Sequence, residues 1–183
     1  MIQRLRMLLP SLALAILTGT GCVLVSGQFL VQFEFGNLSI NAPNTSAVVN
    51  GYYVNLASNG TYNDHKSDIK SLEDLALVGS VHNTGVSSLT LSVYLLDGNA
   101  GPLAVSTVTS TGIKVWGPFT VAAGATEKID WDRSAALFAS GKVPLFARIK
   151  SGVNFTLYGV GSTTPVKFDL NNGVLIAVIG AGK

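Results

Sequence analysis

The sequence predicts an all-β protein, an antiparallel β-sandwich with one or two short connector helices. Three observations support this fold class. Val, Thr, Phe and Tyr are abundant after residue 26, and these residue types favour strands. Stretches rich in Gly, Asn and Ser separate the apolar runs, as turns do. The first run, "QFLVQFEF", alternates apolar and polar side chains, which is the period of a strand with one buried face.

About ten to twelve short strands are expected, a number typical of a sandwich or barrel. In the first strand, residues 28–35, the positions expected to face a core are Phe29, Val31, Phe33 and Phe35. Further strands are predicted at residues 38–41, 47–57, 75–82, 88–97, 104–110, 113–121, 126–132, 143–150, 154–160, 166–170 and 173–179.

Two segments have helical character. Residues 67–76 carry Ile69, Leu72 and Leu75 at a spacing that suits one face of a helix. Residues 132–140 begin with Asp or Ser as a helix cap and are followed by a glycine, as a short helix would be. Each segment is about two turns long, so both are expected to be connectors.

The C-terminal segment, "VKFDLNNGVLIAVIGAGK", is expected to form a hairpin that turns at residues 171–173. Asn and Gly tolerate the positive φ that two-residue hairpin loops require. The six residues after Gly173 are all apolar, which indicates a strand buried on both faces. The competing interpretation is a strand donated to a neighbouring subunit.

Two stretches, "LEDLALVGSVHNTGVSSLTLSVYLLD" and "GPFTVAAGATEKIDWD", each indicate strand, turn and strand. Together they resemble Ig-like or LEA14-type β-sandwich modules of bacterial envelope proteins. The similar parts, "VGSVHNTG" and "TVAAGATEKI", cover under a third of the chain. The resemblance implies an Ig-like or related sandwich and carries no functional residue across.

The N-terminus, "MIQRLRMLLPSLALAILTGTGC", has the parts of a signal peptide. Arg4 and Arg6 supply positive charge, and residues 8–17 form an apolar segment. That segment is too short to cross a bilayer, which takes roughly 20 apolar residues. Residues 19–21 are small, as cleavage requires. Cleavage therefore fits better than a permanent anchor.

The single cysteine of the chain, Cys22, follows at once. A small residue before a cysteine resembles the lipobox of bacterial lipoproteins, in which the thiol takes a diacylglycerol and becomes the mature N-terminus. The family usually has an aliphatic residue three places before the cleaved bond, where this chain has Gly19. Two other interpretations stay open, namely ordinary cleavage near Gly21 or Ser26, and an uncleaved anchor.

The expected organisation is a signal peptide at 1–21, a lipid-anchored tether at 22–26 and a single β-sandwich domain at 27–183. The lipobox resemblance implies a protein attached to the membrane of the bacterial cell envelope. Val23 stands where aspartate often signals inner-membrane retention, so in a Gram-negative host the resemblance implies the outer membrane.

Charge excludes one class of partner. The chain has 12 basic and 10 acidic residues, and removing Arg4 and Arg6 leaves 12 − 2 = 10 basic residues against the same 10 acidic ones. A neutral protein with scattered charges lacks the clustered basic face that nucleic acid requires. No cofactor is predicted either.

Two groups of residues are candidates for chemistry. In "TYNDHKSD", Tyr62, Asp64 and His65 are the first candidates for a carbohydrate or small-ligand site. In "KIDWD", Asp130 and Asp132 would project from one face if the segment is a strand, as a hydrolase pair could. A solvated loop and a helix cap, respectively, are the structural alternatives that we favour.

The function expected from these observations is that of a non-catalytic envelope lipoprotein with a structural or protein-interaction role. An extracytoplasmic module that binds carbohydrate or a small ligand is the alternative, and a hydrolase that uses Asp130 and Asp132 is a third. Motifs for a catalytic nucleophile or a phosphate loop are missing from the sequence.

Overall fold

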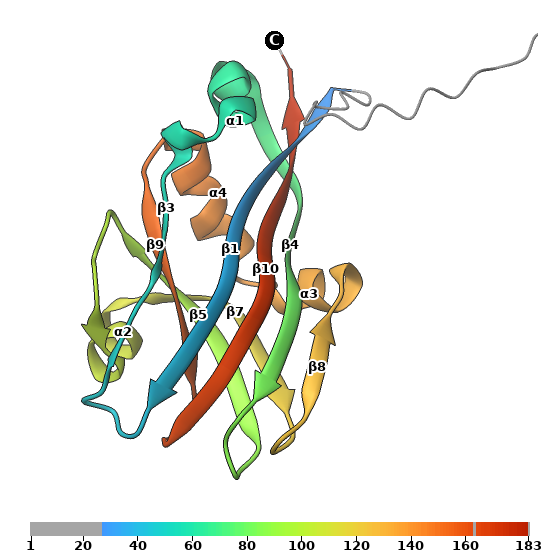
Figure 1. Ribbon diagram of the computed structural model, residues 1–183. Coiled ribbons are helices and arrows are strands. Elements are labelled where there is room, and N and C mark those ends of the chain that lie inside the picture. The colour runs from blue at the N-terminus through green and yellow to red at the C-terminus, as the bar shows by residue number, and fades with distance from the viewer. Residues whose placement is uncertain (1–26, 163, 183) are drawn as a thin grey trace, which may run out of the picture.

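Two four-stranded antiparallel sheets pack face to face in the computed structural model (Figure 1). The structure describes residues 27–162 and 164–182. The predicted signal peptide at 1–21, the tether at 22–26 and Cys22 lie outside the described residues. In the first sheet the strand order is β1 (Gln28–Ala42), β10 (Val166–Ala181), β4 (Ile69–Asn83) and β8 (Thr126–Ile129). In the second sheet it is β3 (Tyr52–Val54), β9 (Phe155–Gly161), β5 (Leu89–Asp97) and β7 (Ile113–Val121).

Short elements connect these strands. A two-residue ladder joins β2 (Val48–Val49) to β6 (Leu103–Ala104). The α-helices are α1 (Gly60–His65), α2 (Val105–Thr111), α3 (Trp131–Leu137) and α4 (Lys142–Ser151). The 3₁₀ turns are η1 (Leu56–Ser58) and η2 (Lys66–Asp68).

The strand order is that of a jelly roll. Along the chain, the main strands alternate between the two sheets, except that β5 and β7 are neighbours in the second sheet. Two interlocked Greek keys of eight strands produce this pattern. An immunoglobulin domain instead places its first, second, fifth and fourth strands in one sheet. The predicted antiparallel β-sandwich is therefore confirmed, with jelly-roll connections.

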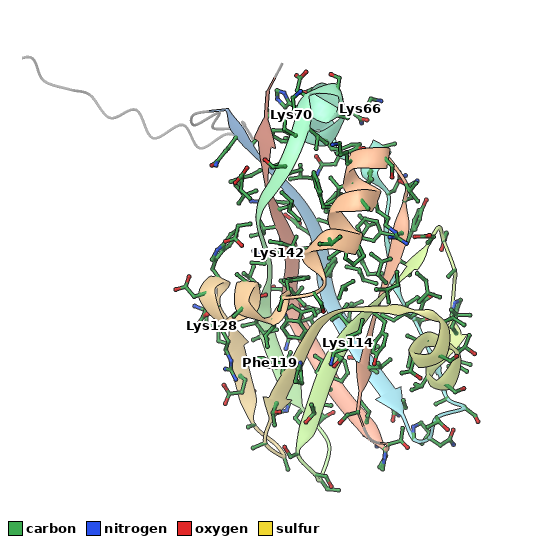
Figure 2. The ribbon with its side chains drawn as sticks, turned by 180° about the vertical axis from the view of Figure 1, so that it is seen from behind. Lys66, Lys70, Lys114, Phe119, Lys128 and Lys142 are labelled. Atoms are coloured by element: carbon green, nitrogen blue, oxygen red, sulfur yellow. The ribbon has the colours of Figure 1, made fainter. Side chains whose placement is uncertain are left out.

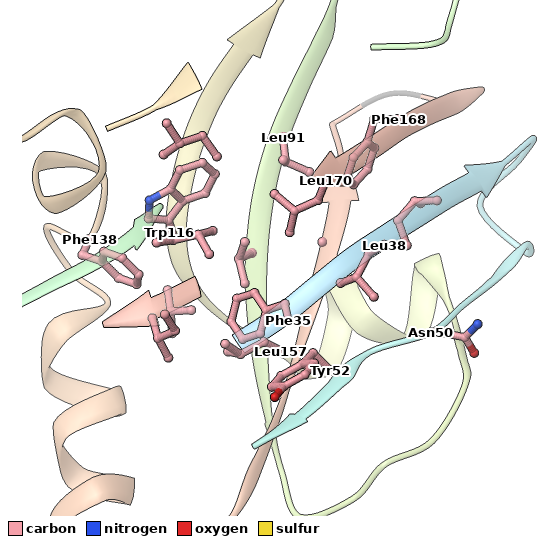
Figure 3. A pocket seen from close by; sticks show the side chains of 17 residues that line it. Phe35, Leu38, Asn50, Tyr52, Leu91, Trp116, Phe138, Leu157, Phe168 and Leu170 are labelled. Atoms are coloured by element: carbon pink, nitrogen blue, oxygen red, sulfur yellow. The ribbon is translucent and has the colours of Figure 1, made fainter. Parts of the chain in front are cut away.

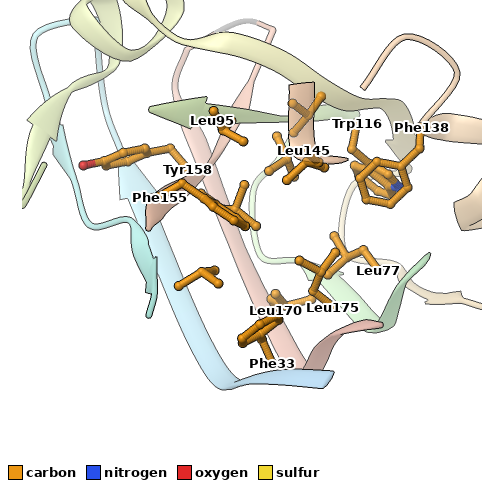
Figure 4. Close-up of a cluster of buried hydrophobic side chains, with 14 of the residues drawn as sticks. Phe33, Leu77, Leu95, Trp116, Phe138, Leu145, Phe155, Tyr158, Leu170 and Leu175 are labelled. Atoms are coloured by element: carbon orange, nitrogen blue, oxygen red, sulfur yellow. The ribbon is translucent and has the colours of Figure 1, made fainter. Parts of the chain in front are cut away.

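The core lies between the sheets (Figure 4), and α3 and α4 pack against β4 and β7 on one side of it. The alternation in β1 is as predicted: Phe29, Val31 and Phe33 are buried, whereas the residues between them, Leu30 and Gln32, are exposed. Helix α4 adds Leu145 and Ile149, which lie one turn apart and are both fully buried. Apolar side chains from both sheets and from the helices thus share one core.

The predicted C-terminal hairpin is wrong. β10 continues from Val166 to Ala181, and residues 171–173 form a bulge within it. Its partner on β1 shifts from Leu170↔Leu38 to Gly173↔Gly36, and Asn172 takes the positive φ of 51°. Because β10 pairs with β1 on one edge and β4 on the other, its two ladders outweigh the local preference of Asn-Asn-Gly for a turn.

Three other segments also differ from the prediction. Residues 69–83 form a long strand, β4, where the sequence suggested a helix at 67–76. Residues 105–111 and 142–151 are helices, α2 and α4, where strands were predicted at 104–110 and 143–150. In short segments that mix apolar and polar residues the hydrophobic periodicity is weak. Packing against neighbouring elements therefore decides whether such a segment forms a helix or a strand.

The structure predicts a difference in stability between the two faces of β10. Leu175 is 1% exposed in the core, whereas Val174 is half-buried on the outer face of the same strand. Replacing Leu175 with Ala should lower the free energy of unfolding by about 2–5 kcal/mol. The matched Val174→Ala change should cost about 1 kcal/mol. Urea unfolding measures both values, and equal losses would contradict this arrangement.

Candidate functional site

The two ends of the sandwich carry different features. At one end the first described residue, Gly27, lies beside the last residue of β10: Ala181 N donates to Gly27 O at 2.6 Å. At the opposite end β1 and β4 finish and β5, β8 and β10 begin (Figure 1). We call these the N-terminal end and the loop end. β1 spans 15 residues between them, a distance of roughly 45–50 Å at about 3.3 Å per residue.

A buried asparagine organises the loop end. Asn83, the last residue of β4, is 1% exposed. Its Nδ2 donates to Ser87 O at 2.8 Å and to Val121 O and Ala122 O at 3.1 Å. Its Oδ1 accepts a hydrogen bond from Gly85 N at 2.9 Å. One side chain therefore holds the β4–β5 loop against the β7–β8 loop.

The backbone of Asn83 completes this arrangement. Asn83 N donates to Ala125 O at 2.9 Å, and Gly124 N donates to Asn83 O at 3.0 Å. Buried polar groups destabilise a fold unless they are paired, and here each polar atom of Asn83 has a partner. The loops at this end are thus held in place without regular secondary structure.

An open cavity of about 340 Å³ lies beside Asn83 at the loop end. Its lining consists mainly of short polar, glycine and proline residues from the loop at 84–88 and from the start of β10. Val86 stands at the loop tip and is 94% exposed. Lys167 supplies a positive charge, and none of the described lining residues is acidic. Loops on a rigid scaffold are the usual place for binding residues.

A second, smaller void lies inside the sandwich. It has a volume of about 50 Å³ and is lined by apolar side chains from both sheets (Figure 3). Its outer rim contains Asn50 and the rings of Phe35 and Tyr52, whose centroids are 4.3 Å apart and whose planes are tilted by 57°. Binding pockets for small ligands usually measure about 300–1,000 Å³, so we treat this void as a feature of the core.

Tyr52 contributes the ionisable group of this rim. Burial raises the pKa of its hydroxyl above the ordinary value, and the nearby carboxylate of Glu34 raises it further. The hydroxyl therefore stays protonated at neutral pH. A protonated hydroxyl cannot act as a general base, so Tyr52 supplies no base at this void.

The structure places the residues of the predicted ligand site on α1. Tyr62 is 4% exposed, and its hydroxyl donates to Ile149 O in α4 at 2.8 Å. The ring of His65 packs on Phe29 with centroids 4.9 Å apart, and Asp64 is exposed. Tyr62 therefore points into the core while Asp64 faces solvent, so these two side chains do not share one surface. Ligand binding at this position stays a prediction.

The structure does not place Asp130 and Asp132 on one strand. β8 ends at Ile129, and Asp130 is the cap of α3: its side chain accepts a hydrogen bond from Arg133 N at 3.0 Å. Asp132 lies in the first turn of the helix and is exposed. The spacing rule for strands does not apply here because the chain changes to a helix between them. A short helix was predicted here, but its cap is Asp130 and not Asp132 or Ser134 as predicted.

Within residues 27–162 and 164–182, no group of three or more His, Cys, Asp or Glu side chains is arranged to hold a metal ion. No helix in the same part of the chain is both long and apolar enough to cross a membrane.

The sequence analysis did not predict the structural role of Asn83. Its signal was the "HNTG" motif, since Asn before a glycine turn often bonds the backbone two residues on.

No protein-family model matches the chain, and no curated protein matches it in sequence. Among solved structures, the chain is similar to a protein in a structure of infectious bursal disease virus, Gx strain, with a TM-score of 0.35 and 13% identity. The similarity covers 85% of this chain and 34% of the viral chain. This chain thus spans about a third of the length of that protein.

Asn83 provides a test of how the loop end is held. Replacing it with Ala should lower the free energy of unfolding by about 1–3 kcal/mol, because buried carbonyl groups lose their donor. Asn83→Asp should also destabilise, since a carboxylate would face the oxygens of Val121 and Ala122. The exposed Asn41 on β1 is the matched control, and Asn41→Ala should change stability by at most about 0.5 kcal/mol. Urea unfolding together with hydrogen exchange of the loop amides would measure these effects. Stability unchanged by Asn83→Ala would contradict the role of this side chain.

Proposed function

We propose that this protein is a non-catalytic lipoprotein of the bacterial cell envelope that makes contacts at its two opposite ends. Lipid on Cys22 attaches the N-terminal end to the membrane, in a Gram-negative host the outer membrane. The loop end contacts another envelope protein.

The observation that carries this proposal is the separation of the two ends. Residues 22–26 can span at most about 18 Å when fully extended, so a lipid on Cys22 would keep Gly27 close to the membrane surface. β1 then runs away from Gly27 toward the loop end, which would stand roughly 45–50 Å further out. The loop end, whose two loops are joined by Asn83, is therefore the part best placed to reach a partner.

The chemistry of the loop end suits a protein contact. Val86 is a fully exposed apolar side chain at a loop tip, surrounded by Ser and Thr residues whose hydroxyls both donate and accept hydrogen bonds. Interfaces between proteins combine an apolar centre with a polar rim in this way. Ordered loops also lose little conformational entropy when they bind.

The role of Asp130 supports a non-catalytic protein. Its carboxylate bonds the backbone of α3, and the neighbouring Asp132 is exposed to solvent. A hydrolase pair would need two carboxylates that face one another across a cleft.

Lipid attachment is tested on Cys22. The intact mass of the protein purified from bacterial membranes should include a diacylglyceryl group, and Cys22→Ala should leave the precursor unlipidated. One acyl chain anchors only marginally, so the lipoproteins that this N-terminus resembles carry two or three. A mature N-terminus at Gln28 with no lipid would refute the anchor.

Contact at the loop end is tested by a photo-crosslinking amino acid at position 86. In intact cells it should give one discrete adduct, which should disappear in the Cys22→Ala background because the lipid that places the loop end beside its partner is missing. Val143 on α4, 76% exposed and outside the loop end, is the matched control position and should give none. Adducts of equal yield from both positions, or from position 143 alone, would count against the loop end.

A further inference from the structure

The outer face of the β1-β10-β4-β8 sheet changes character along its length. Toward the N-terminal end it carries half-buried apolar side chains, such as Ile176 and Val178 of β10. Toward the loop end it carries polar side chains, such as His82, whose Nδ1 lies 2.9 Å from Thr126 Oγ1. A shallow groove of about 580 Å³ lies between these two regions. We call it the Trp131 groove, and its lining residues are Val78, Gly79, Ser80, Lys128, Ile129, Asp130, Trp131, Asn171 and Asn172.

A row of polar side chains crosses the floor of this groove. In the ladders, Asn171 of β10 pairs with Ser80 of β4, and Ser80 pairs with Lys128 of β8. Directly opposed residues project from the same face of a sheet, and neighbouring strands lie about 4.8 Å apart. The three side chains therefore form a row about 10 Å wide. Figure 2 shows Lys128 next to α3, at the edge of the molecule.

The bulge in β10 brings a second carboxamide to the groove. In a regular strand, consecutive side chains point to opposite faces. Here both Asn171 and Asn172 line the groove, because the bulge interrupts the alternation at the residue with φ of 51°. Among the described residues, no hydrogen bond is formed by the side chains of Ser80, Lys128, Asn171 or Asn172. The groove thus presents donors and acceptors that the fold does not use.

Trp131 lines the groove, and a hydrogen bond holds its indole ring. Trp131 is half-buried, and its Nε1 donates to Asp74 Oδ2 at 2.8 Å. Asp74 Oδ1 in turn accepts hydrogen bonds from Lys142 Nζ at 3.0 Å and from Leu75 N at 2.8 Å. Asp74 thus fixes the orientation of the Trp131 ring at the groove.

The pKa of Asp74 determines the pH range in which its ionised carboxylate accepts the hydrogen bond from Trp131. Burial alone would raise the pKa, but the hydrogen bonds from Lys142, Leu75 N and Trp131 outweigh burial and leave it below the ordinary value. The ionised carboxylate therefore stabilises the fold above its unfolded-state pKa, and that contribution is lost as pH falls through the lowered folded-state pKa. At neutral pH the carboxylate is ionised and the ring is held.

We propose that the Trp131 groove binds a saccharide. A sugar ring has an apolar C–H face and a rim of hydroxyl groups that both donate and accept hydrogen bonds. An indole packs against the apolar face, while carboxamide and hydroxyl side chains match the rim. Pockets that combine an aromatic surface with a few placed polar groups bind small polar molecules in one orientation.

The same residues disfavour two other classes of ligand. An anion would meet the carboxylate of Asp130 in the groove beside the cation of Lys128. A purely apolar ligand would remove water from the polar row without replacing its hydrogen bonds, which costs free energy. The groove lies on the side of the sandwich, so this inference does not depend on the lipid or on the loop end.

The test is binding of neutral tetrasaccharides to the full-chain protein purified in detergent. The probes are tetramers of glucose, mannose and N-acetylglucosamine, measured by calorimetry and by tryptophan fluorescence. The chain has two tryptophans, and Trp116 is 1% exposed, so a fluorescence change on binding reports Trp131. At least one tetramer should bind saturably and alter the fluorescence.

Substitutions then locate the site. Trp131→Ala should weaken binding at least tenfold, Trp131→Phe should retain part of it, and Asn171→Ala should weaken it several-fold. Asn41→Ala and Lys114→Ala are the matched controls, because both side chains are exposed on other strands, and they should bind as the parent protein does. Cys22→Ala should also bind normally, which separates this result from the lipid test.

Three outcomes would overturn the proposal. They are no saturable binding by any of the tetramers, binding unchanged by Trp131→Ala and Asn171→Ala, and equal losses in the groove variants and the matched controls. Thermal unfolding of each variant shows whether it is folded. If Trp131→Ala does not fold, Asn171→Ala and Trp131→Phe decide the question.

Discussion

The pairing of β10 with β1 on one edge and β4 on the other is the constraint on which the rest of the structure depends. Both ladders run along nearly the whole of a 16-residue strand. They hold the N-terminal and C-terminal strands of the jelly roll side by side, and they present Leu175, Ala177 and Ile179 to the core. The first and last described residues therefore lie at one end of the sandwich, and the loops of the β4–β5 and β7–β8 connections lie at the other.

The irregularity in β10 has a consequence on the outer face. A bulge adds a residue to one strand and turns side chains out of their regular alternation. Here it directs Asn171 and Asn172 toward the Trp131 groove, while the residues on either side keep their pairing. The segment that looked most like a turn in the sequence thus supplies polar groups to a surface without ending the strand.

Polar groups in this protein are used mainly to hold the backbone. Asn83 joins two loops, Tyr62 bonds the end of α4, and Asp130 begins α3. Each of these side chains is satisfied by backbone partners, so it adds order to a connection and leaves little capacity for chemistry. Ser80, Lys128, Asn171 and Asn172 lack such partners among the described residues and lie together in the groove, which is why binding is the activity that we associate with it.

The sequence by itself determined the class of fold, because alternation is a local property: the β1 pattern, β5 and β7 follow from consecutive residues and lie close to their predicted ranges. It also predicted a short helix at α3, although the cap is Asp130 and not the predicted Asp132 or Ser134. Only the tertiary structure decided the state of residues 69–76, 105–111 and 142–151 and the path of β10, since these depend on partners far away in the chain. The same holds for the candidate sites. Asn83 meets Val121, and Trp131 meets Asp74, across separations of 38 and 57 residues, and local sequence patterns carry no record of such contacts.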